Sequence, residues 1–369
     1  MRHVRRLGLL LSLSFLAASF GLAAPPASPP RLILLPQGFA DAKGRIGYFA
    51  GATGGVEAID LANGKVLWQT LEAQRPLLID GDHLLAQAGT KRNRLRILRL
   101  DLKRQGECDL ESDPIVFPAW GVTGEALGRS FAGRWRIEHH HLVLDWEANA
   151  WYVGPTRPTK EEATAARKHA DGQVFIDLRT GQIDIRPAEK TEPPTLPPLP
   201  EQLEQKALRW QGLVDTHWKV LALEEKKGRQ RFVLHSWDQL KGKTEESKEL
   251  LRGERLLARV TLDERILCLR EANPSPDERN SLMTKKPSAP WHLFSVETGK
   301  SVGSIPDEAG MHAIAVLGKR VFYLAPGAMH GTLERGSLQA QTLRVLDLSS
   351  GKKLWEHPVA GKLIAPPPL

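Results

Sequence analysis

Short apolar and polar runs alternate along most of the chain, and one arrangement of them returns six times. Each copy has an apolar strand, an acidic residue, a few further residues, a turn glycine and a second strand. Apolar alternation of this kind is typical of sheet strands, and the glycine supplies the positive φ that a tight hairpin needs. The repeat therefore predicts an antiparallel hairpin. The copies are VEAIDLANGKVLW (56–68), LRILRLDLKRQGE (95–107), VFIDLRTGQIDI (174–185), FVLHSWDQLKGKT (232–244), HLFSVETGKSVG (292–303) and LRVLDLSSGKKLW (343–355).

A second hairpin pattern precedes several copies: two apolar runs separated by a polar turn. It stands at 76–87, 256–269 and 313–324. Two successive hairpins make a four-stranded antiparallel sheet, and sheets of this size that pack face to face are propeller blades. The fold class predicted is all-β, a β-propeller of six to eight blades, of which six are recognisable.

The spacing of the repeats predicts insertions. The turn glycines at 64, 106, 181, 242, 299 and 351 are 42, 75, 61, 57 and 52 residues apart, whereas a propeller blade takes about 40–50 residues. We place insertions near 155–171, where 158–170 is predicted as a short charged helix, and near 187–206, a proline-rich segment expected in extended polyproline form. Alternatively, the 75-residue interval contains a degenerate blade around 141–153.

The first residues indicate export. A basic start and the apolar run 7–22 predict a signal peptide at 1–23, followed by a linker at 24–30 and the propeller at 31–369. An uncleaved N-terminal anchor is the alternative, and after cleavage no membrane span is expected. Removing the three leader arginines reduces the net charge from +8 to +5. So mild an excess, without a basic stripe interleaved with aromatic residues, argues against nucleic acid as a partner. We expect a periplasmic or secreted monomer.

The motif D-x-x-T-G-K-x-x-W, with P-L-L-x-D-G-D-x-L near it, resembles the repeat of the pyrroloquinoline-quinone-like β-propeller family. That family includes quinoprotein alcohol dehydrogenases and the propeller subunit of the outer-membrane β-barrel assembly machinery. The resemblance implies that Trp68 and Trp355 pack between neighbouring blades, while Ile185 and Val302 stand near that position in other copies. The residues assigned to the blade motif are Asp60, Gly64, Trp68, Asp177, Gly181, Gly299, Asp347, Gly351 and Trp355.

Quinone chemistry in that family implies a disulfide between adjacent cysteines and a Ca²⁺ ion held by oxygen ligands. The two cysteines, Cys108 and Cys268, are far apart in the sequence, and either one disulfide or two buried thiols would suit them. Asp109, Glu111 and Asp113 alternate, but their segment is interpreted as a loop. We therefore expect no cofactor, no metal and no catalytic residue.

Histidines and tryptophans supply the other candidates. His139, His140 and His141 could bind a metal, but on a strand only His139 and His141 share a face, and two ligands are too few for a closed zinc site. The remaining histidines cannot be paired from the sequence. Four tryptophans could line a ligand groove, although filling blade interfaces is the interpretation we favour. They are Trp135, Trp146, Trp151 and Trp218.

The sequence therefore predicts an exported, non-catalytic binding or scaffold propeller of the cell envelope, with a protein or peptide as its partner. Two alternatives belong to other classes. One is a quinone-dependent or hydrolytic enzyme, which would show convergent charged residues in a funnel. The other is a carbohydrate-binding or sensor propeller, which would expose tryptophan faces.

Overall fold

The computed structural model describes residues 33–88, 94–117, 127–152, 168–187, 208–214, 216–272, 289–308, 311–326 and 341–360. The chain divides into two units, Met1–Arg31 and Leu32–Leu369, and all described residues belong to the second. The expected signal peptide and linker lie outside the described residues, as do the segment 188–207 and the chain end from Gly361. Among the described residues, no helix is long and apolar enough to span a membrane.

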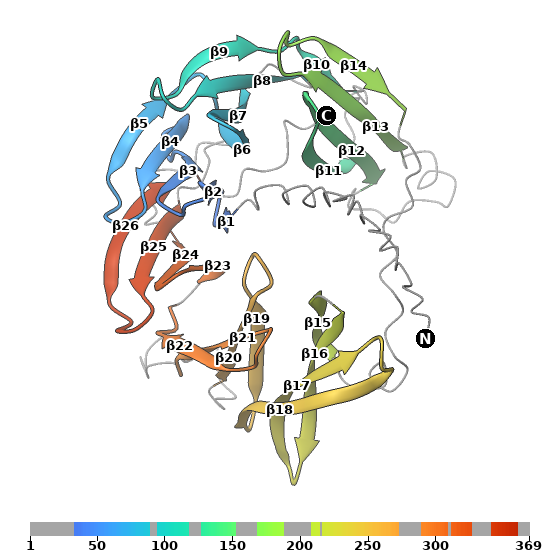
Figure 1. Cartoon of the computed structure of the whole chain (residues 1–369), viewed down its shortest axis with the longest axis vertical. Coiled ribbons are helices and arrows are strands. Elements are labelled where there is room, and N and C mark those ends of the chain that lie inside the picture. The colour runs from blue at the N-terminus through green and yellow to red at the C-terminus, as the bar shows by residue number, and fades with distance from the viewer. Residues whose placement is uncertain are drawn as a thin grey trace, which may run out of the picture. The chain divides into compact units, whose positions relative to one another are not determined.

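The described residues form six antiparallel sheets, each made from consecutive strands, as the colour sequence in Figure 1 shows. The first sheet contains β1 (Ile33–Leu35), β2 (Gly38–Ala40), β3 (Ile46–Ala50), β4 (Val56–Asp60) and β5 (Val66–Thr70). The second contains β6 (Arg75–Asp80), β7 (His83–Ala88), β8 (Arg94–Asp101), β9 (Glu107–Glu111) and β10 (Ile115–Val116). The third contains β11 (Leu127–Glu138), β12 (His141–Tyr152), β13 (Lys168–Asp177) and β14 (Ile183–Arg186).

The other three sheets have four strands each. The fourth contains β15 (Leu208–Val214), β16 (His217–Lys226), β17 (Arg229–Asp238) and β18 (Lys243–Gly253). The fifth contains β19 (Leu256–Val260), β20 (Ile266–Glu271), β21 (Trp291–Ser295) and β22 (Ser301–Ile305). The sixth contains β23 (His312–Leu317), β24 (Arg320–Pro326), β25 (Gln341–Asp347) and β26 (Lys353–Val359).

The repeated motif forms the turn between the last two long strands of each sheet. In the first sheet, Asp60 Oδ1 accepts a hydrogen bond from the Ala62 amide at 2.8 Å, and the Gly64 amide donates to the Asp60 carbonyl at 2.8 Å. This is the turn geometry for which a short acidic side chain and a glycine are selected. Asp177 and Asp347 cap their turns in the same way. In the fifth sheet Ser295 occupies this position, two residues before the Glu297 that the sequence pattern favoured, and its Oγ accepts from the Thr298 amide at 3.2 Å.

Five hydrophobic clusters each join two neighbouring sheets, and among the described residues none joins the third sheet to the fourth. Leu85 and Leu144 belong to the cluster between the second and third sheets, and Ala58 and Leu84 to the one between the first and second. The fourth and fifth sheets, the fifth and sixth, and the sixth and first share the remaining clusters. Sheets that pack face to face through buried apolar side chains are the blades of a propeller, so the predicted fold class is confirmed.

The sixth sheet closes onto the first. Leu35 of β1 and Val359 of β26 are buried in one cluster, and Val359 also forms a β-bridge with Gly51. Next to this bridge the Ala360 amide donates to the Ala50 carbonyl at 2.9 Å, and His357 Nε2 lies 2.6 Å from Glu57 Oε2. Both ends of the described chain therefore meet at one interface, although the segment from Gly361 onward lies outside the described residues.

Two sequence interpretations need correction. The strand 141–153 does not form the core of a degenerate extra blade, because β12 pairs with β11 and β13 within the third sheet. The predicted helix at 158–170 lies mostly outside the described residues. Its last three residues, Lys168–Ala170, instead begin β13.

Candidate functional site

The motif tryptophans cover turn glycines of neighbouring blades. Trp355 of the sixth sheet lies over Gly64 of the first, where an added Cβ would lie 2.7 Å from Trp355 Cδ2. The Trp355 indole also donates to the Leu61 carbonyl at 3.2 Å. Trp68 of the first sheet covers Gly106 of the second in the same way, with Cε3 at 2.8 Å from such a Cβ. Since both glycines have positive φ and a flat ring against them, no side chain would fit at either position.

Other residues replace tryptophan at the remaining interfaces. At the second-to-third interface the Arg99 guanidinium donates to the Leu178 carbonyl, which is equivalent to the Leu61 carbonyl that accepts from Trp355. Gly181 at this interface packs against backbone, because a Cβ added there would lie 2.7 Å from the Glu111 carbonyl oxygen. Gly299 of the fifth sheet is covered by the aliphatic stem of Lys248, 3.0 Å from such a Cβ. In the third sheet, Phe175, two residues before Asp177, pairs with Asp184, so Asp184 stands at the tryptophan position and the next residue, Ile185, is 55% exposed.

The fifth-to-sixth interface has no aromatic side chain at this position. The register pairs Trp68 with Ala58 and Trp355 with Val345. The equivalent pair in the fifth sheet joins Gly303 to Leu293, so Gly303 rather than Val302 stands at the tryptophan position. In the sixth sheet, Gly351 has a single atom near the place of a Cβ, Pro306 Cδ at 3.9 Å.

An open groove of about 800 Å³ lies at this interface. We call it the β22 groove. Its walls are the outer strand β22 and the turn Leu348–Gly351, together with Pro290, His292 and Pro306. A second groove, of about 400 Å³, occupies the corresponding place between β5 and the β8–β9 turn, where Trp68 covers Gly106. The groove without a tryptophan is therefore about twice as large.

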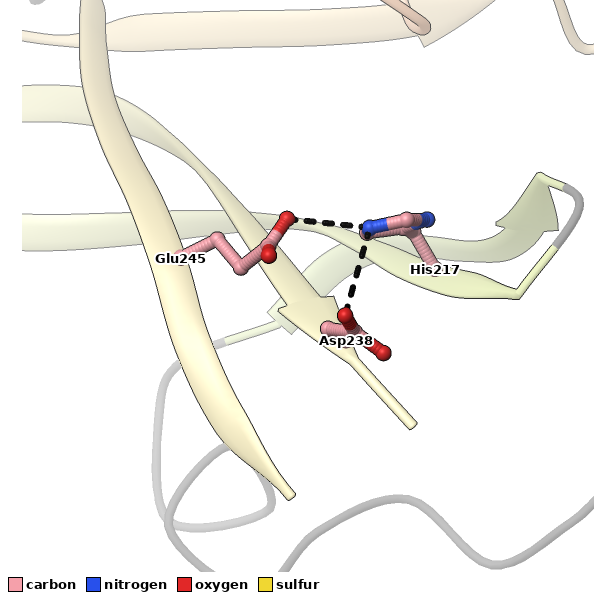
Figure 2. Close-up of side chains that lie close together, drawn as sticks. All are labelled: His217, Asp238 and Glu245. Carbon is pink, nitrogen blue, oxygen red and sulfur yellow. Dashed lines mark hydrogen bonds and ion pairs between the residues drawn. The ribbon is translucent and has the colours of Figure 1, made fainter. Parts of the chain in front are cut away.

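A cluster of polar side chains lies at the corner of the fourth sheet, shown in Figure 2. His217 opens β16, Asp238 closes β17, and Glu245 lies on β18. His217 Nε2 is 3.0 Å from Glu245 Oε2 and 3.9 Å from Asp238 Oδ2. The register explains the arrangement, because His217 stands directly opposite Asp238. His83 and His141 stand likewise opposite Asp101 and Asp177, so three successive blades carry a histidine facing the motif aspartate.

Imidazole and carboxylate groups at these separations could hold a divalent ion. Lys241 occupies that role instead. Its ammonium lies 3.0 Å from Asp238 Oδ2 and 2.5 Å from Glu245 Oε1, between the two carboxylates. The hydrogen bond from Lys241 is the largest cause of the lowered pKa of Asp238 and of the lowered pKa of Glu245. Hydrogen bonding to Glu245 is in turn the largest cause of the raised pKa of Lys241. The corner is therefore an ion-pair cluster in which one ammonium group, that of Lys241, lies between two carboxylates.

Replacing Lys241 by methionine should change how stability depends on pH. Carboxyl groups with a lowered pKa stabilise the folded state above their unfolded pKa of about 4, and this stabilisation is lost as the pH falls through the folded pKa. The wild-type melting temperature should therefore fall as the pH decreases below about 5. The K241M variant should melt below wild type near neutral pH and converge with it in acid.

The control for this prediction is Lys243→Met, which removes an exposed lysine at the start of β18, two residues after Lys241. It should lower the melting temperature by the same small amount at every pH. A K241M curve that runs parallel to the wild-type curve would show that Lys241 does not set the pKa of these acids.

A second polar network crosses the fourth sheet. Ser247 Oγ lies 2.7 Å from His235 Nδ1, and His235 Nε2 lies 3.2 Å from Glu224 Oε1. Arg231 Nη2 donates to the other Glu224 oxygen at 2.7 Å. A nucleophilic serine would also require oxyanion donors and a cavity for substrate. Neither groove described above is lined by these residues, so we interpret the network as cross-strand hydrogen bonding between β16, β17 and β18.

The acidic candidates for Ca²⁺ differ from the sequence interpretation. Asp109 and Glu111 lie on strand β9 rather than in a loop. Asp109 pairs with Arg99 Nε at 2.9 Å and with His83 Nε2 at 3.3 Å, while Glu111 pairs with Arg96. Both carboxylates thus already have cationic or imidazole partners.

The histidine run is also not a strand. His139 and His140 form the β11–β12 turn, His139 with φ of 55°, and His141 begins β12 with its ring edge toward Phe175. The argument that His139 and His141 share a strand face is therefore wrong. Because His139 and His140 are in a turn, only His141 of the three histidines lies on a strand.

Both cysteines are free thiols in the structure. Cys108 is half-buried on β9, and Cys268 is fully buried on β20 in the cluster between the fifth and sixth sheets. Burial raises the pKa of the Cys268 thiol to about 12, which disfavours its reactive thiolate. The sequence left open either one disulfide or two thiols, and the structure shows two separate thiols.

Three of the four candidate tryptophans pack inside blades or between them. Trp146 is edge-on to Phe117 in the cluster between the second and third sheets, and Trp135 packs against the same cluster. Trp218 is 2% exposed. The side chain of Trp151 lies outside the described residues. Sequence reasoning missed the β22 groove, and the signal that could have found it is the glycine at position 303.

Comparisons with known proteins assign no family to this chain. No family model matches the chain, and no curated protein matches it. Among solved structures, the chain is similar to the dihydro-heme d1 dehydrogenase NirN, with 16% identity, 89% of this chain and 67% of that chain covered, and a TM-score of 0.30. A europium-containing methanol dehydrogenase shows 10% identity, coverages of 90% and 79%, and a TM-score of 0.33. AztD from Citrobacter koseri shows 11% identity, coverages of 88% and 86%, and a TM-score of 0.32. At these values the similarity assigns no activity.

Proposed function

We propose that the chain is an exported, non-catalytic propeller of the pyrroloquinoline-quinone-like type that binds a protein or peptide in the cell envelope. The observation that carries this proposal is the β22 groove, an open and uncharged concavity of about 800 Å³ between two blades. Open grooves beside an outer strand suit extended polypeptides, which bind along a strand edge.

The state of the reactive side chains supports a binding role. Asp238 and Glu245 share an ion pair with Lys241, Asp109 is paired with Arg99, and Glu224 with Arg231. General acid–base catalysis needs groups free to exchange protons with a substrate at accessible positions. In each of these clusters an internal cation holds the carboxylate instead.

Two alternative functions fit the described residues less well. A quinone enzyme of the family's disulfide type would need neighbouring cysteines, whereas Cys108 and Cys268 lie on strands of different sheets. A carbohydrate-binding propeller would present tryptophan faces to solvent, whereas Trp146 and Trp218 are buried.

The proposal is tested with two measurements on the mature chain, residues 24–369. In the first, the chain is titrated with pyrroloquinoline quinone and Ca²⁺ and assayed with an artificial electron acceptor on alcohols and aldoses. We expect weak, salt-sensitive quinone association and no turnover, because a planar anionic cofactor needs stacking faces and paired charges. Stoichiometric, salt-resistant binding with turnover would overturn the non-catalytic assignment.

The second measurement identifies the partner. Tagged mature chain is incubated with native envelope extract, cross-linked and analysed by quantitative mass spectrometry, with heat-unfolded chain as the control. We expect saturable enrichment of a defined protein by the folded chain only. Equal enrichment by folded and unfolded chain would contradict a specific binding function.

A further inference from the structure

We propose that the β22 groove binds an extended polypeptide segment through one aromatic side chain laid over Gly351. This inference rests on the proposed binding function and deepens it by naming the chemistry of the partner. Three observations carry it: the internal precedent at two other interfaces, the size and charge of the groove, and the outer strand that forms one of its walls.

The precedent comes from the chain itself. Gly64, Gly106 and Gly351 follow the same acidic turn in their sheets and all have positive φ, of 76°, 82° and 67°. Trp355 covers the first and Trp68 the second. Gly351 presents the same flat backbone surface, but the neighbouring fifth sheet has Gly303 at the tryptophan position and supplies no ring.

The chain cannot fill this position from its own outer strand. Gly303 stands where the tryptophan stands in the other copies, and a Cβ there would lie 2.7 Å from Leu348 Cδ1. The strand is thus held close to the turn of the sixth sheet. Among the described residues, the only atom within 4 Å of the place of a Cβ on Gly351 is Pro306 Cδ, so we place the ring that would cover this glycine on another molecule.

The composition of the groove favours a neutral, extended partner. Apart from His292, none of its lining residues carries an ionisable side chain. The hydroxyl groups of Ser301, Ser304 and Ser349 can exchange hydrogen bonds with peptide groups. Charged or phosphorylated ligands would find no cationic partner among these residues.

The wall formed by β22 adds a means of alignment. β22 is the last strand of its sheet and pairs with β21 on one side. An extended peptide can add to such an edge through main-chain hydrogen bonds, with alternate side chains directed into a groove. An aromatic residue at one of those positions would lie toward Gly351.

The experiment uses a fluorescently labelled, end-capped peptide with the uncharged sequence of residues 66–70, VLWQT, as the probe, together with its Trp→Ala counterpart. Binding to the mature chain is measured by fluorescence anisotropy. We expect saturable binding of the tryptophan peptide and binding weaker by about tenfold or more for the alanine peptide, because most of the affinity comes from burying the ring.

Variants place the site. Ser304→Trp fills the groove from β22, and Val302→Arg introduces charge beside it; each should weaken the tryptophan peptide by about tenfold or more. The matched control is Leu67→Trp, an exposed position on the outer strand β5 of another blade, which should leave binding unchanged. Circular dichroism confirms that each variant is folded, and two groove variants keep the test valid if one is not.

Equal binding of the two peptides, binding that is unaffected by both groove variants, or no binding of either peptide would overturn the inference. Displacement of the peptide by neutral oligosaccharides at lower concentration than by unlabelled peptide would also overturn it, since the groove would then be a carbohydrate site. If envelope extract yields a partner whose capture is unaffected by Ser304→Trp and Val302→Arg, the inference fails while the proposed binding function stands.

Discussion

Replacing Trp355 by alanine is expected to lower the free energy of unfolding by about 3–5 kcal/mol, the usual cost of truncating a buried aromatic side chain. Trp355 is 8% exposed, lies edge-on to Phe322 at 6.2 Å between ring centroids, and covers Gly64 of the adjoining blade. Its removal therefore opens a cavity at the interface through which the sixth sheet closes onto the first. The measurement is urea denaturation followed by circular dichroism.

Two further variants make this prediction specific. Trp355→Phe keeps a ring at the interface but loses the hydrogen bond to the Leu61 carbonyl, so it should cost clearly less than the alanine variant. Leu354→Ala changes the adjacent, 46% exposed residue and should cost less than about 1 kcal/mol. If Trp355→Ala and Leu354→Ala were equally stable, Trp355 would not be holding the closure together.

The fold could be predicted from the sequence because the residues that determine each hairpin lie close together in the sequence. Asp60 and Gly64 are four residues apart, and their turn chemistry is complete within the hairpin they form. Repetition of such a hairpin, with a second one upstream, is enough to indicate a blade. The misassigned acidic position at Glu297 shows the limit, because a serine hydroxyl at Ser295 caps the turn as an aspartate would.

The candidate sites could not be predicted because they depend on register between strands and on contacts between blades. Gly303 stands four residues after turn Gly299, as Trp68 and Trp355 stand after Gly64 and Gly351, because the same bulge occurs in all three sheets. The pairing of β13 with β14 has no such shift, so Asp184 rather than Ile185 stands at that position, which the spacing does not reveal. Similarly, His217, Asp238 and Glu245 come from three strands of one sheet. The pairing of those strands, and not a sequence motif, brings the three side chains together.

A charged network beside the β22 groove links the fifth and sixth sheets. Asp307, which follows the groove residue Pro306, accepts from Arg270 Nη1 at 2.6 Å and from the Trp291 indole at 2.7 Å. The Arg259 and Arg270 guanidinium groups also lie 4.9 and 4.8 Å from the Trp291 ring centroid. Arg259 donates to the Met311 carbonyl, and Arg344 of the sixth sheet pairs with Glu308. These contacts fasten the connection between the two blades at both of its ends.

Replacing Asp307 by asparagine is therefore expected to destabilise the chain by roughly 2–3 kcal/mol. Breaking a fully buried ion pair costs about 3–5 kcal/mol, and here the side chains of Arg270 and Asp307 remain 18% and 13% exposed. Asparagine preserves the shape and can still accept from Trp291, so the loss of stability reports mainly on the charge opposite Arg270.

The matched control is Asp184→Asn, which removes one charge from an exposed pair with Arg186 and should cost no more than about 1 kcal/mol. A double-mutant cycle with Arg270→Gln, measured by urea denaturation, isolates the coupling between the two side chains. If Asp307→Asn and Asp184→Asn cost the same and the cycle showed no coupling, the network would not be fastening the fifth blade to the sixth.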